Sequence, residues 1–294
     1  MSVTAIIPMW NRAELTRQCV AALRQQTVAF DRILVVDDGS TEPFHGDDVL
    51  RLPENRGFAA AVNAGWRAAT TTHIAVINND VRLHPAWLEH LLAAGGWFAT
   101  GKLFRPDGLL DGTFDLLSRG GFAWRAGHGR PDGGPWDTPR EISMASFTAV
   151  LLRTELREQV GELNESFGSY YEDVEFGVRC RRAGLRGRYV PAATGRHEGS
   201  ATAGAWSAFT VRQISTNHAR LVAQHWGKSH RWAVVAAEFL WRELARRRGH
   251  RAVFPVFPVR PAAPLACDDA LIQALQQETG FDTFWRWYFR LVRP

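Results

Sequence analysis

Cysteine is scarce in this sequence, with three copies among 294 residues. Cys19, Cys180 and Cys267 are odd in number and lack the spacing of a metal site. A disulfide framework needs pairs of cysteines, and such frameworks belong to oxidising compartments. We therefore expect a protein of a reducing compartment in which all three thiols are ordinary packing residues.

Long apolar runs are missing as well. The longest uncharged one near the C-terminus, Trp232 to Ala237, meets Glu238 and falls far short of the roughly 20 residues that span a bilayer. The first residues enter an apolar segment directly, without the basic stretch, apolar core and cleavage site of a signal peptide. We expect no transmembrane helix and a cytoplasmic location. With 46% hydrophobic residues, the chain can still bury a substantial core.

Lysine is nearly absent, so the net charge of +5 comes almost entirely from arginine, whose planar group binds phosphate and carboxylate bidentately. The densest arginine cluster, 242–251, follows the apolar stretch 232–241. Residues 232–251 therefore resemble a helix that rests on the anionic inner face of the cell membrane. A core-packed helix with a solvated basic end explains the same pattern, and both interpretations stay open. Aromatic residues do not interleave with the arginines as stacking on bases would require, so we expect no nucleic-acid partner.

Glycine-rich phosphate loops are the last absence. A first strand that leads into G-x-G-x-x-G would indicate a Rossmann dehydrogenase. Here the first apolar segment leads into PMWNR, from Pro8 to Arg12, and the full P-loop pattern G-x-x-x-x-G-K-[ST] does not occur. Both of these nucleotide-binding classes are therefore excluded. A sugar nucleotidyltransferase, which usually begins with a Gly-rich basic loop, is disfavoured on the same ground but stays an alternative.

Apolar β-type segments alternate with helical patterns over the first hundred residues, and this alternation predicts a parallel sheet. The expected strands are 3–7, 32–36, 49–52 and 73–77, and the expected helices are 12–26, 57–69 and 85–94. Later segments are less regular, and a Gly-rich stretch at 120–137 predicts a mobile loop. The remaining expected elements are a strand and turn at 101–108, strands at 145–152 and 187–190, a helix at 172–183, and helices after Trp206 that prolines interrupt between 255 and 264.

Acidic residues follow the ends of two predicted strands, in VVDDGS at 35–40 and INND at 77–80. In open α/β sheets this edge binds ligands. Two further polar motifs occur later in the chain, YYEDVEFGVRCRRAG at 170–184 and RHEG at 196–199. A sheet edge that presents carboxylates would meet phosphates through a metal ion, and Mg²⁺ and Mn²⁺ are the cations that bridge carboxylate and diphosphate oxygens.

The order of these motifs resembles the family 2 glycosyltransferases, which are inverting enzymes with a GT-A fold, from Val3 to about Gly204. The segments that carry the resemblance are AIIPMWNR, ILVVDDGS, ENRGFAAAVNAG, AVINNDV, GKLFRPDG, FTAVLLRTEL, GELNESFGSYYEDVEFGVRCRRAG and YVPAATGRHEGS. The branch of rhamnosyltransferase-like enzymes looks most similar. The resemblance implies an α/β fold of GT-A type, with a Rossmann-like, mostly parallel central sheet flanked by helices. We expect this nucleotide-sugar transferase domain at 1–204 and a helical C-terminal extension at 205–294.

The family's nucleotide-binding roles fall on residues near the first two strands. By resemblance, Pro8 borders the nucleotide base and Asp38 bonds the base edge. Asp37 instead organises the turn, and backbone N–H bonds are an alternative role for Asp38 too. Gly57 and Asn63 resemble the loop and helix start that close over the nucleoside, although a glycine turn and a polar helix residue would give the same pattern.

Asn78-Asn79-Asp80 stands where the family has its D-x-D motif, with an amide in place of the first acid. The resemblance implies that Asp80 coordinates the metal and that the sugar or ribose is bound at Asn78 and Asn79. His197 matches a family histidine that completes the metal or diphosphate site. A helix-entry cap for Asp80 and a structural role for His197 are the alternatives.

Glu172 and Asp173 open a predicted helix, where the helix dipole stabilises negative charge. Capping is therefore one explanation for the two acids. By resemblance, Asp173 is the general base that deprotonates the acceptor hydroxyl, and Glu172 holds the acceptor or orients Asp173. A base must lie within hydrogen-bond reach of the attacking oxygen.

The implied reaction moves a sugar from a nucleoside diphosphate sugar, such as dTDP-rhamnose or a UDP-sugar, to the hydroxyl of a glycan or lipid-linked acceptor. Mn²⁺ or Mg²⁺ would stabilise the leaving diphosphate. The setting would be cell-surface polysaccharide or glycolipid assembly, and the oligomeric state is left open. A non-catalytic nucleotide-sugar-binding or scaffolding relative is the alternative. The segment 120–134 could close as a lid, and the arginines there would meet phosphate or stay solvated: Arg119, Arg125 and Arg130.

Overall fold

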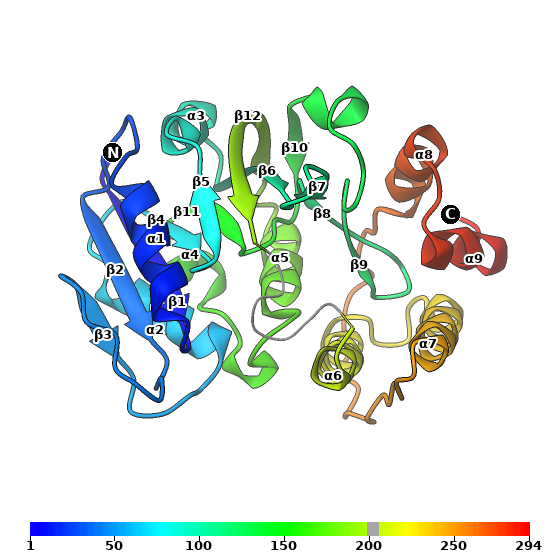
Figure 1. The fold of residues 1–294 in the computed structure, drawn as a ribbon. Helices are drawn as coiled ribbons and strands as arrows, with labels where there is room; N and C mark the ends of the chain where they lie inside the picture. Colours follow the sequence, from blue (N-terminus) through cyan, green and yellow to red (C-terminus); the bar gives the residue numbers. More distant parts are fainter. Residues whose placement is uncertain (199–205) are drawn as a thin grey trace. The chain divides into compact units, whose positions relative to one another are not determined.

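The computed structural model describes residues 1–198 and 206–294. Its centre is a ten-stranded mixed sheet (Figure 1). The strands are β1 (Val3–Met9), β2 (Arg32–Asp37), β3 (Val49–Arg51), β4 (His73–Ile77), β5 (Val81–Leu83), β6 (Phe98–Phe104), β7 (Leu110–Gly112), β10 (Arg140–Ile142), β11 (Ala149–Arg153) and β12 (Gly187–His197).

The main path of the sheet has the order β10-β12-β6-β11-β4-β1-β2-β3, with β5 paired to β12 and β7 paired to β6. Strands β1 to β4 are parallel in their pairings, so that Ile6 lies opposite both Leu34 of β2 and Val76 of β4. Strand β11 runs antiparallel between β4 and β6, and β12 runs parallel to β6. The predicted α/β fold with a central sheet flanked by helices is confirmed. The sheet is mixed rather than mostly parallel, because β5, β7, β10 and β11 pair antiparallel with their neighbours.

Both faces of the sheet are buried, which explains why its inner strands are apolar without interruption. Helices α1 (Ala13–Leu23) and α3 (Trp87–Ala94) share one core with the odd-numbered residues of β1. Helix α2 (Phe58–Ala68) packs on the opposite face, where a Cβ at Gly65 would lie 2.5 Å from Cγ2 of Ile6. Helix α5 (Glu172–Arg182) lies with α2, since Phe176 contacts Trp66 at a ring distance of 5.9 Å. A short helix, α4 (Leu156–Val160), precedes it.

The segment for which the sequence predicts a mobile Gly-rich loop has defined contacts. It contains strand β9 (Ala123–Arg125), which pairs with β8 (Asp115–Leu117), and a 3₁₀ turn at Gly134–Asp137. Tyr189 donates a hydrogen bond of 2.6 Å to the carbonyl of buried Trp136, and the ammonium of buried Lys102 lies 2.6 Å from Asp132. These partners come from distant parts of the chain, so a local sequence pattern cannot predict these contacts.

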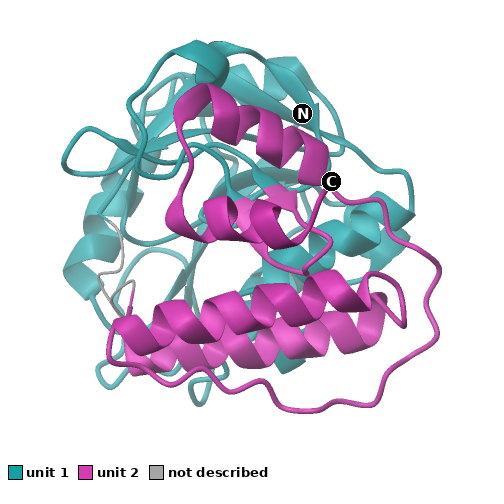
Figure 2. Ribbon diagram, turned by 90° about the vertical axis from the view of Figure 1, so that its right-hand side faces the viewer, with its two compact units in different colours: residues 1–115, 125–199 teal, residues 116–124, 200–294 magenta. Residues whose placement is uncertain are grey.

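The chain divides into two compact units, coloured separately in Figure 2. The first comprises 1–115 and 125–199, and the second comprises 116–124 and 200–294. The predicted domain boundary at 204/205 lies outside the described residues. Among the helices described, none is long and apolar enough to cross a membrane. The helices of the second unit are α6 (Ala208–His225), α7 (Arg231–Arg247), α8 (Asp269–Thr279) and α9 (Thr283–Leu291).

Helices surround the short segment 116–124 within the second unit. The indole of Trp226 in α6 donates a hydrogen bond of 2.8 Å to the carbonyl of Arg119. The hydroxyl of Tyr288 in α9 accepts from the amide of Gly120 at 3.0 Å and donates to Asp269 at 2.9 Å. These bonds make 116–124 part of the core of the second unit, although the sequence gives no sign of it.

Candidate active site

Three polar residues from distant parts of the chain meet at one edge of the sheet. His197 ends β12 and pairs with Val81 of β5, which brings its ring beside Asp80. Its Nε2 lies 3.2 Å from Oδ1 of Asp80, and its Nδ1 lies 2.9 Å from Oδ2 of Asp111. All three residues are buried. The two predicted metal ligands are therefore brought together, with a third residue that the sequence analysis did not identify.

Opposing charges dominate this cluster in the metal-free protein. Burial disfavours the imidazolium form of His197, but the carboxylates of Asp111 and Asp80 outweigh burial and raise the pKa of His197 to about 9. For Asp111, burial is likewise outweighed by His197 and Arg125, which lower the pKa of its carboxyl. His197 is thus a cation between two carboxylates near neutral pH.

We expect this pairing to make the stability of the metal-free protein depend on pH. The pKa of His197 rises from 6.5 to about 9 on folding, so its stabilising effect is fully present below 6.5 and is lost as pH rises through 9. The expected difference in unfolding free energy across this range is roughly 3 kcal/mol. Urea unfolding with a chelator present measures it, and Asp111→Asn should shrink it. An unchanged free energy in the wild type would contradict the pairing.

The cluster fits a divalent cation whose remaining ligands come from a substrate. With Nδ1 held by Asp111, the Nε2 of His197 is directed to the same point as the carboxylate of Asp80. Metal-binding histidines commonly have such a carboxylate on their other ring nitrogen. Within the described ranges, no three His, Cys, Asp or Glu side chains are arranged so that they could hold one metal ion together. Two protein ligands are nevertheless sufficient for Mg²⁺, which usually keeps water and substrate phosphates in its coordination shell.

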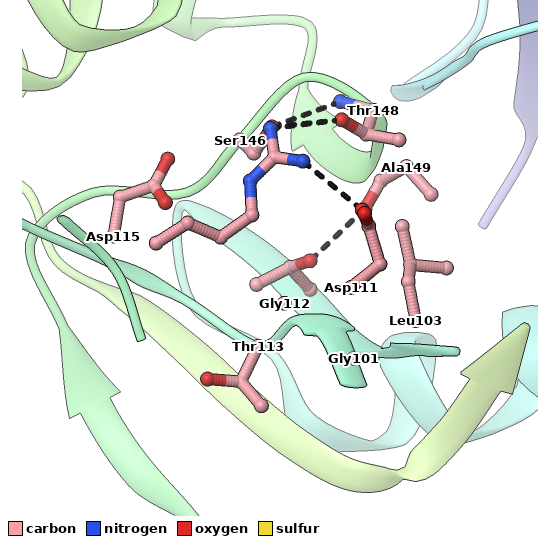
Figure 3. Close-up of a pocket in the computed structure, with 11 residues that line it drawn as sticks. Gly101, Leu103, Asp111, Gly112, Thr113, Asp115, Ser146, Thr148 and Ala149 are labelled. Atoms are coloured by element: carbon pink, nitrogen blue, oxygen red, sulfur yellow. Dashed lines mark hydrogen bonds and ion pairs between the residues drawn. The ribbon is translucent and has the colours of Figure 1, made fainter. Parts of the chain in front are cut away.

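Arg125 connects this cluster to a second part of the site. Its Nη1 donates to Oδ2 of Asp111 at 3.0 Å. Its Nη2 donates to Oγ of Ser146 at 2.6 Å and to Oγ1 of Thr148 at 3.2 Å (Figure 3). The sequence analysis considered phosphate binding or a solvated charge for Arg125. In the structure the side chain is 34% exposed and is bound within the protein.

The second part of the site is the start of helix α5. Asp173 accepts hydrogen bonds from the backbone N–H of Val174 at 2.8 Å and of Phe147 at 3.3 Å. Phe147 lies between the two residues whose hydroxyl groups Arg125 binds. A continuous set of contacts therefore runs from His197 through Asp111 and Arg125 to the turn that holds Asp173.

The two acids at the start of α5 have different environments. Burial raises the pKa of Asp173, while Arg125 and the backbone N–H groups oppose this rise. Glu172 is more deeply buried, and its Oε2 has no hydrogen-bond partner among the described residues. Burial and the neighbouring charge of Asp173 raise the pKa of Glu172 well above its ordinary value. Asp173 is accordingly the more accessible and the more readily ionised of the pair.

The backbone before α5 is conformationally unusual. Tyr170 and Tyr171 adopt left-handed conformations, with φ of 68° and 72°. Asn11 and Arg12, in the loop after β1, do the same at 58° and 60°. Non-glycine residues rarely adopt this conformation, and where they do it is often at a functional site. Both pairs lie in segments that carry the family resemblance.

The first two acids have separate structural roles. Asp37 accepts hydrogen bonds from the amides of Ser40 at 2.9 Å and Phe44 at 3.1 Å, which confirms that it organises the turn. Asp38 accepts from the amides of Arg56 and Gly57, each at 2.8 Å. Asp38 therefore fixes the loop in which Gly57 has a φ of 88°. The contact of Asp38 with the edge of the nucleotide base stays a prediction.

Four other predicted residues are less closely joined to the cluster. Pro8 is buried in β1 opposite Val36, and the amide of Asn79 donates to the hydroxyl of Thr16 at 3.1 Å. The roles predicted for them, for Asn63 and for Asn78 stay predictions. The amide of Asn63 bonds the backbone of Leu163 in both directions, at 2.9 Å, whereas the buried Oδ1 of Asn78 has no hydrogen-bond partner in the described part of the chain.

Asp111 was not predicted from the sequence, and Arg125 was predicted only as a phosphate-binding or solvated residue of a lid. Both lie between 104 and 140, where strands of three residues are too short to show a period. The only local signal is an acid directly after the apolar pair Leu109-Leu110.

Comparisons with known proteins agree with the family resemblance. The family Glycosyl transferase family 2 matches residues 4–95. The chain is 33% identical over 213 residues to the pre-mycofactocin glycosyltransferase of Mycobacterium tuberculosis, covering 67% of this chain and 42% of that protein. It is 30% identical over 202 residues to the N-acetylglucosaminyl-diphospho-decaprenol L-rhamnosyltransferase of the same organism, covering 56% of this chain and 66% of that protein. The chain thus spans less than half of the first relative's length.

Two solved structures share the fold. Similarity to GalNAc-T7, solved with UDP, GalNAc and Mn²⁺, has a TM-score of 0.65 at 12% identity and covers 99% of this chain and 56% of that one. Similarity to the mannosyltransferase PcManGT from Pyrobaculum calidifontis, in complex with GDP-Man and Mn²⁺, has a TM-score of 0.52 at 18% identity and covers 74% and 63%. The matched segment, the relatives and the fold together show that the chain belongs to the family 2 glycosyltransferases.

Proposed function

We propose that the protein is a metal-dependent, inverting glycosyltransferase that moves a sugar from a nucleoside diphosphate sugar to an acceptor hydroxyl. The observation that carries this proposal is the set of contacts from the Asp80 and His197 pair to Asp173. It gives one sheet edge a site for a cation beside a carboxylate that can accept a proton. Transfer by direct displacement needs the cation at the leaving diphosphate and the carboxylate at the attacking hydroxyl, on opposite sides of the reacting carbon.

In this proposal Asp173 accepts the proton of the acceptor hydroxyl as that oxygen attacks the anomeric carbon. Glu172, whose pKa is raised by burial and by the charge of Asp173, holds the acceptor or orients Asp173. Asp80 and His197 would hold Mn²⁺ or Mg²⁺, which supplies charge stabilisation to the leaving diphosphate. Asp38, Gly57 and the other residues around the loop after β2 would bind the nucleoside.

An enzyme nucleophile is not required for inversion, and the cysteines are poor candidates for one. Burial raises the pKa of both Cys19 and Cys180 to about 12. Because the thiolate is the nucleophilic form, thiols with such a pKa are inert near neutral pH. A cysteine nucleophile at either of these two positions is therefore disfavoured.

Similarity to an L-rhamnosyltransferase favours dTDP-rhamnose as the donor, with a UDP-sugar as the second choice. The same relative supports a glycan or lipid-linked acceptor and a role in cell-surface polysaccharide or glycolipid assembly. We place the activity in the cytoplasm, where nucleotide sugars would be the donors.

A thermal-shift panel of UDP, dTDP, GDP and their sugars, with and without Mn²⁺, tests the proposal. Ligands that bind only the native state raise its stability by about 2.7 kcal/mol at a concentration of 100 Kd. We expect one base to give a metal-dependent shift that disappears in Asp80→Ala. Asp107→Ala, which changes an exposed acid, should keep the shift.

Turnover separates the alternatives. Release of free nucleoside diphosphate in the presence of an acceptor supports transfer, whereas pyrophosphate release would indicate a nucleotidyltransferase. A nucleotide shift without any turnover on glycan or lipid-linked acceptors would favour a binding or scaffolding protein.

We also propose that helix α7 contacts an anionic membrane surface. Trp232, Val235 and Phe239 are 66%, 50% and 61% exposed, and their spacing of three and four residues places them on one side of the helix. Exposed arginines occur on the same helix at 231, 242 and 246. The opposite side of α7 packs into the second unit, as the core-packed interpretation expects. The membrane-surface interpretation is proposed for the exposed side alone. Apolar burial together with attraction to anionic lipid is the usual basis of such contacts.

Sedimentation with lipid vesicles tests this contact. We expect binding to vesicles containing phosphatidylglycerol, weak binding to pure phosphatidylcholine, and a loss of binding at high salt. The double variant Trp232→Ser/Phe239→Ser should lose most of the binding and keep its thermal stability. Equal binding of wild type and variant would contradict the role of α7.

A further inference from the structure

A narrow polar pocket lies in the first unit between the two halves of the candidate active site. It is lined by residues of β6, β7 and the segment that leads into β11, together with Arg125 and two acids. Asp111 and Asp115 lie on opposite sides of this pocket in the view of Figure 3. The space inside admits a group about the size of one water molecule. The pocket can therefore accept a hydroxyl group but not a whole sugar ring.

Asp115 has the more unusual environment of the two acids. Its exposed fraction is 5%, and within the described ranges its carboxylate has no hydrogen-bond donor, whereas Asp111 bonds both His197 and Arg125. The backbone of Asp115 is fixed by a bond of 3.4 Å from its amide to the carbonyl of Met144. Burying a carboxylate without hydrogen-bond donors costs free energy of folding. A ligand that donates a hydrogen bond to Asp115 would offset this cost.

The charged groups around Asp115 do not supply the hydrogen-bond donor that its carboxylate lacks. Burial raises the pKa of Asp115 to about 7, Arg125 lowers it, and Asp173 and Asp111 raise it further. Arg125 cannot neutralise the carboxylate alone, because its single positive charge is shared among Asp111, Asp115 and Asp173. Its side-chain hydrogen bonds go to Asp111, Ser146 and Thr148. A neutral hydroxyl can donate to the carboxylate without bringing another charge among the three acids.

The position of the pocket also indicates its ligand. Asp111 forms one wall of the pocket and bonds the proposed metal ligand His197. The negative charge of the proposed base Asp173 raises the pKa of Asp115, which places Asp115 near the base. The reacting sugars must lie between those two groups. We propose that Asp115 is a binding residue for a sugar hydroxyl, from the donor or the acceptor, which enters this pocket and donates a hydrogen bond to its carboxylate. This inference rests on the proposed function and adds a residue that determines which sugars fit.

Calorimetry with Mn²⁺ present tests the inference in the full chain. The titrants are dTDP, dTDP-rhamnose, UDP and UDP-glucose, and the proteins are wild type, Asp115→Asn and the exposed control Asp107→Asn. A hydrogen bond to a charged group is expected to contribute about 10- to 100-fold in affinity. If the hydroxyl belongs to the donor, Asp115→Asn loses that factor for the sugar nucleotide and keeps the affinity for the matching nucleotide.

A second arm distinguishes the acceptor as the source. Glucose, rhamnose and N-acetylglucosamine are titrated into the protein saturated with nucleoside diphosphate and Mn²⁺. Binding of one of them that is lost in Asp115→Asn, with donor affinity unchanged, assigns the hydroxyl to the acceptor. Asp115→Ser serves as the second variant if Asp115→Asn does not fold, and the same selective loss is expected.

The outcomes separate this inference from the proposed function. If neither nucleotide binds the wild type, the two donor classes favoured under the proposed function fail before Asp115 is tested. If nucleotide and sugar nucleotide bind and both arms are unchanged in the Asp115 variants, the hydroxyl site is wrong and the glycosyltransferase proposal stands.

Discussion

Asp173→Asn is expected to lower the rate of sugar transfer by roughly 10²- to 10⁴-fold, the range for removal of a general base. Asparagine keeps the size of the side chain, and its single acceptor oxygen can keep the shorter bond from the amide of Val174, which Asp173 accepts on Oδ1. The longer bond from Phe147 to Oδ2 is lost, but the start of α5 should keep its conformation. Donor affinity should therefore change little while kcat falls. Steady-state rates, together with calorimetric donor binding, measure the two effects separately.

Glu172→Gln is the matched control for this variant. Burial and the charge of Asp173 raise the pKa of Glu172 and so favour its protonated carboxyl, which glutamine resembles. We expect a much smaller loss of rate than for Asp173→Asn. A larger loss in Glu172→Gln would assign the base to Glu172 instead.

The pH profile gives an independent check of the base. Since the pKa of Asp173 is raised above its ordinary value, kcat/KM should fall as pH decreases through that raised pKa. Asp173→Asn should lose this acidic limb and keep only its residual rate. A profile that is identical in shape in both proteins would place the titrating base elsewhere.

The sequence predicted those parts of the fold that depend on local pattern. Strands β1, β2 and β4 are apolar and rich in β-branched residues, and the structure has them within two residues of the expected ends. Asp80 and His197 were both predicted to bind the metal because the family resemblance assigns both residues to that site. Their meeting in space depends on the pairing of β5 with β12, and β5 is too short to be recognised from sequence.

Where the sequence analysis was incomplete, the missing information is tertiary. Asp37 and Asp38 are adjacent identical residues, and only their hydrogen bonds separate a turn organiser from a residue that fixes the loop at Gly57. Asp111 stands 86 residues from the histidine that it binds. A local period cannot report a contact across that distance, and a single sequence without relatives gives no other signal for it.

Arg125→Met is expected to affect stability and activity together. Its guanidinium is the positive group among Asp111, Asp115 and Asp173, and it lowers the pKa of the latter two. Removing it leaves acids that repel one another and two hydroxyl groups that lose a donor. Breaking a buried pair costs about 3–5 kcal/mol. Because 34% of the Arg125 side chain is exposed, we expect roughly 2–3 kcal/mol in urea unfolding.

Arg125→Lys separates charge from position. Lysine keeps the positive charge but cannot reach Asp111 and both hydroxyl groups with one planar fork. It should recover most of the lost stability, whereas the turn at Phe147 that bonds Asp173 would lose its anchor and kcat should stay low. Mn²⁺ affinity should also stay below that of the wild type, since Asp111 would hold His197 less firmly. If lysine restored kcat together with stability, Arg125 would act through its charge alone, and the contacts from the metal pair to the base would not be what positions Asp173.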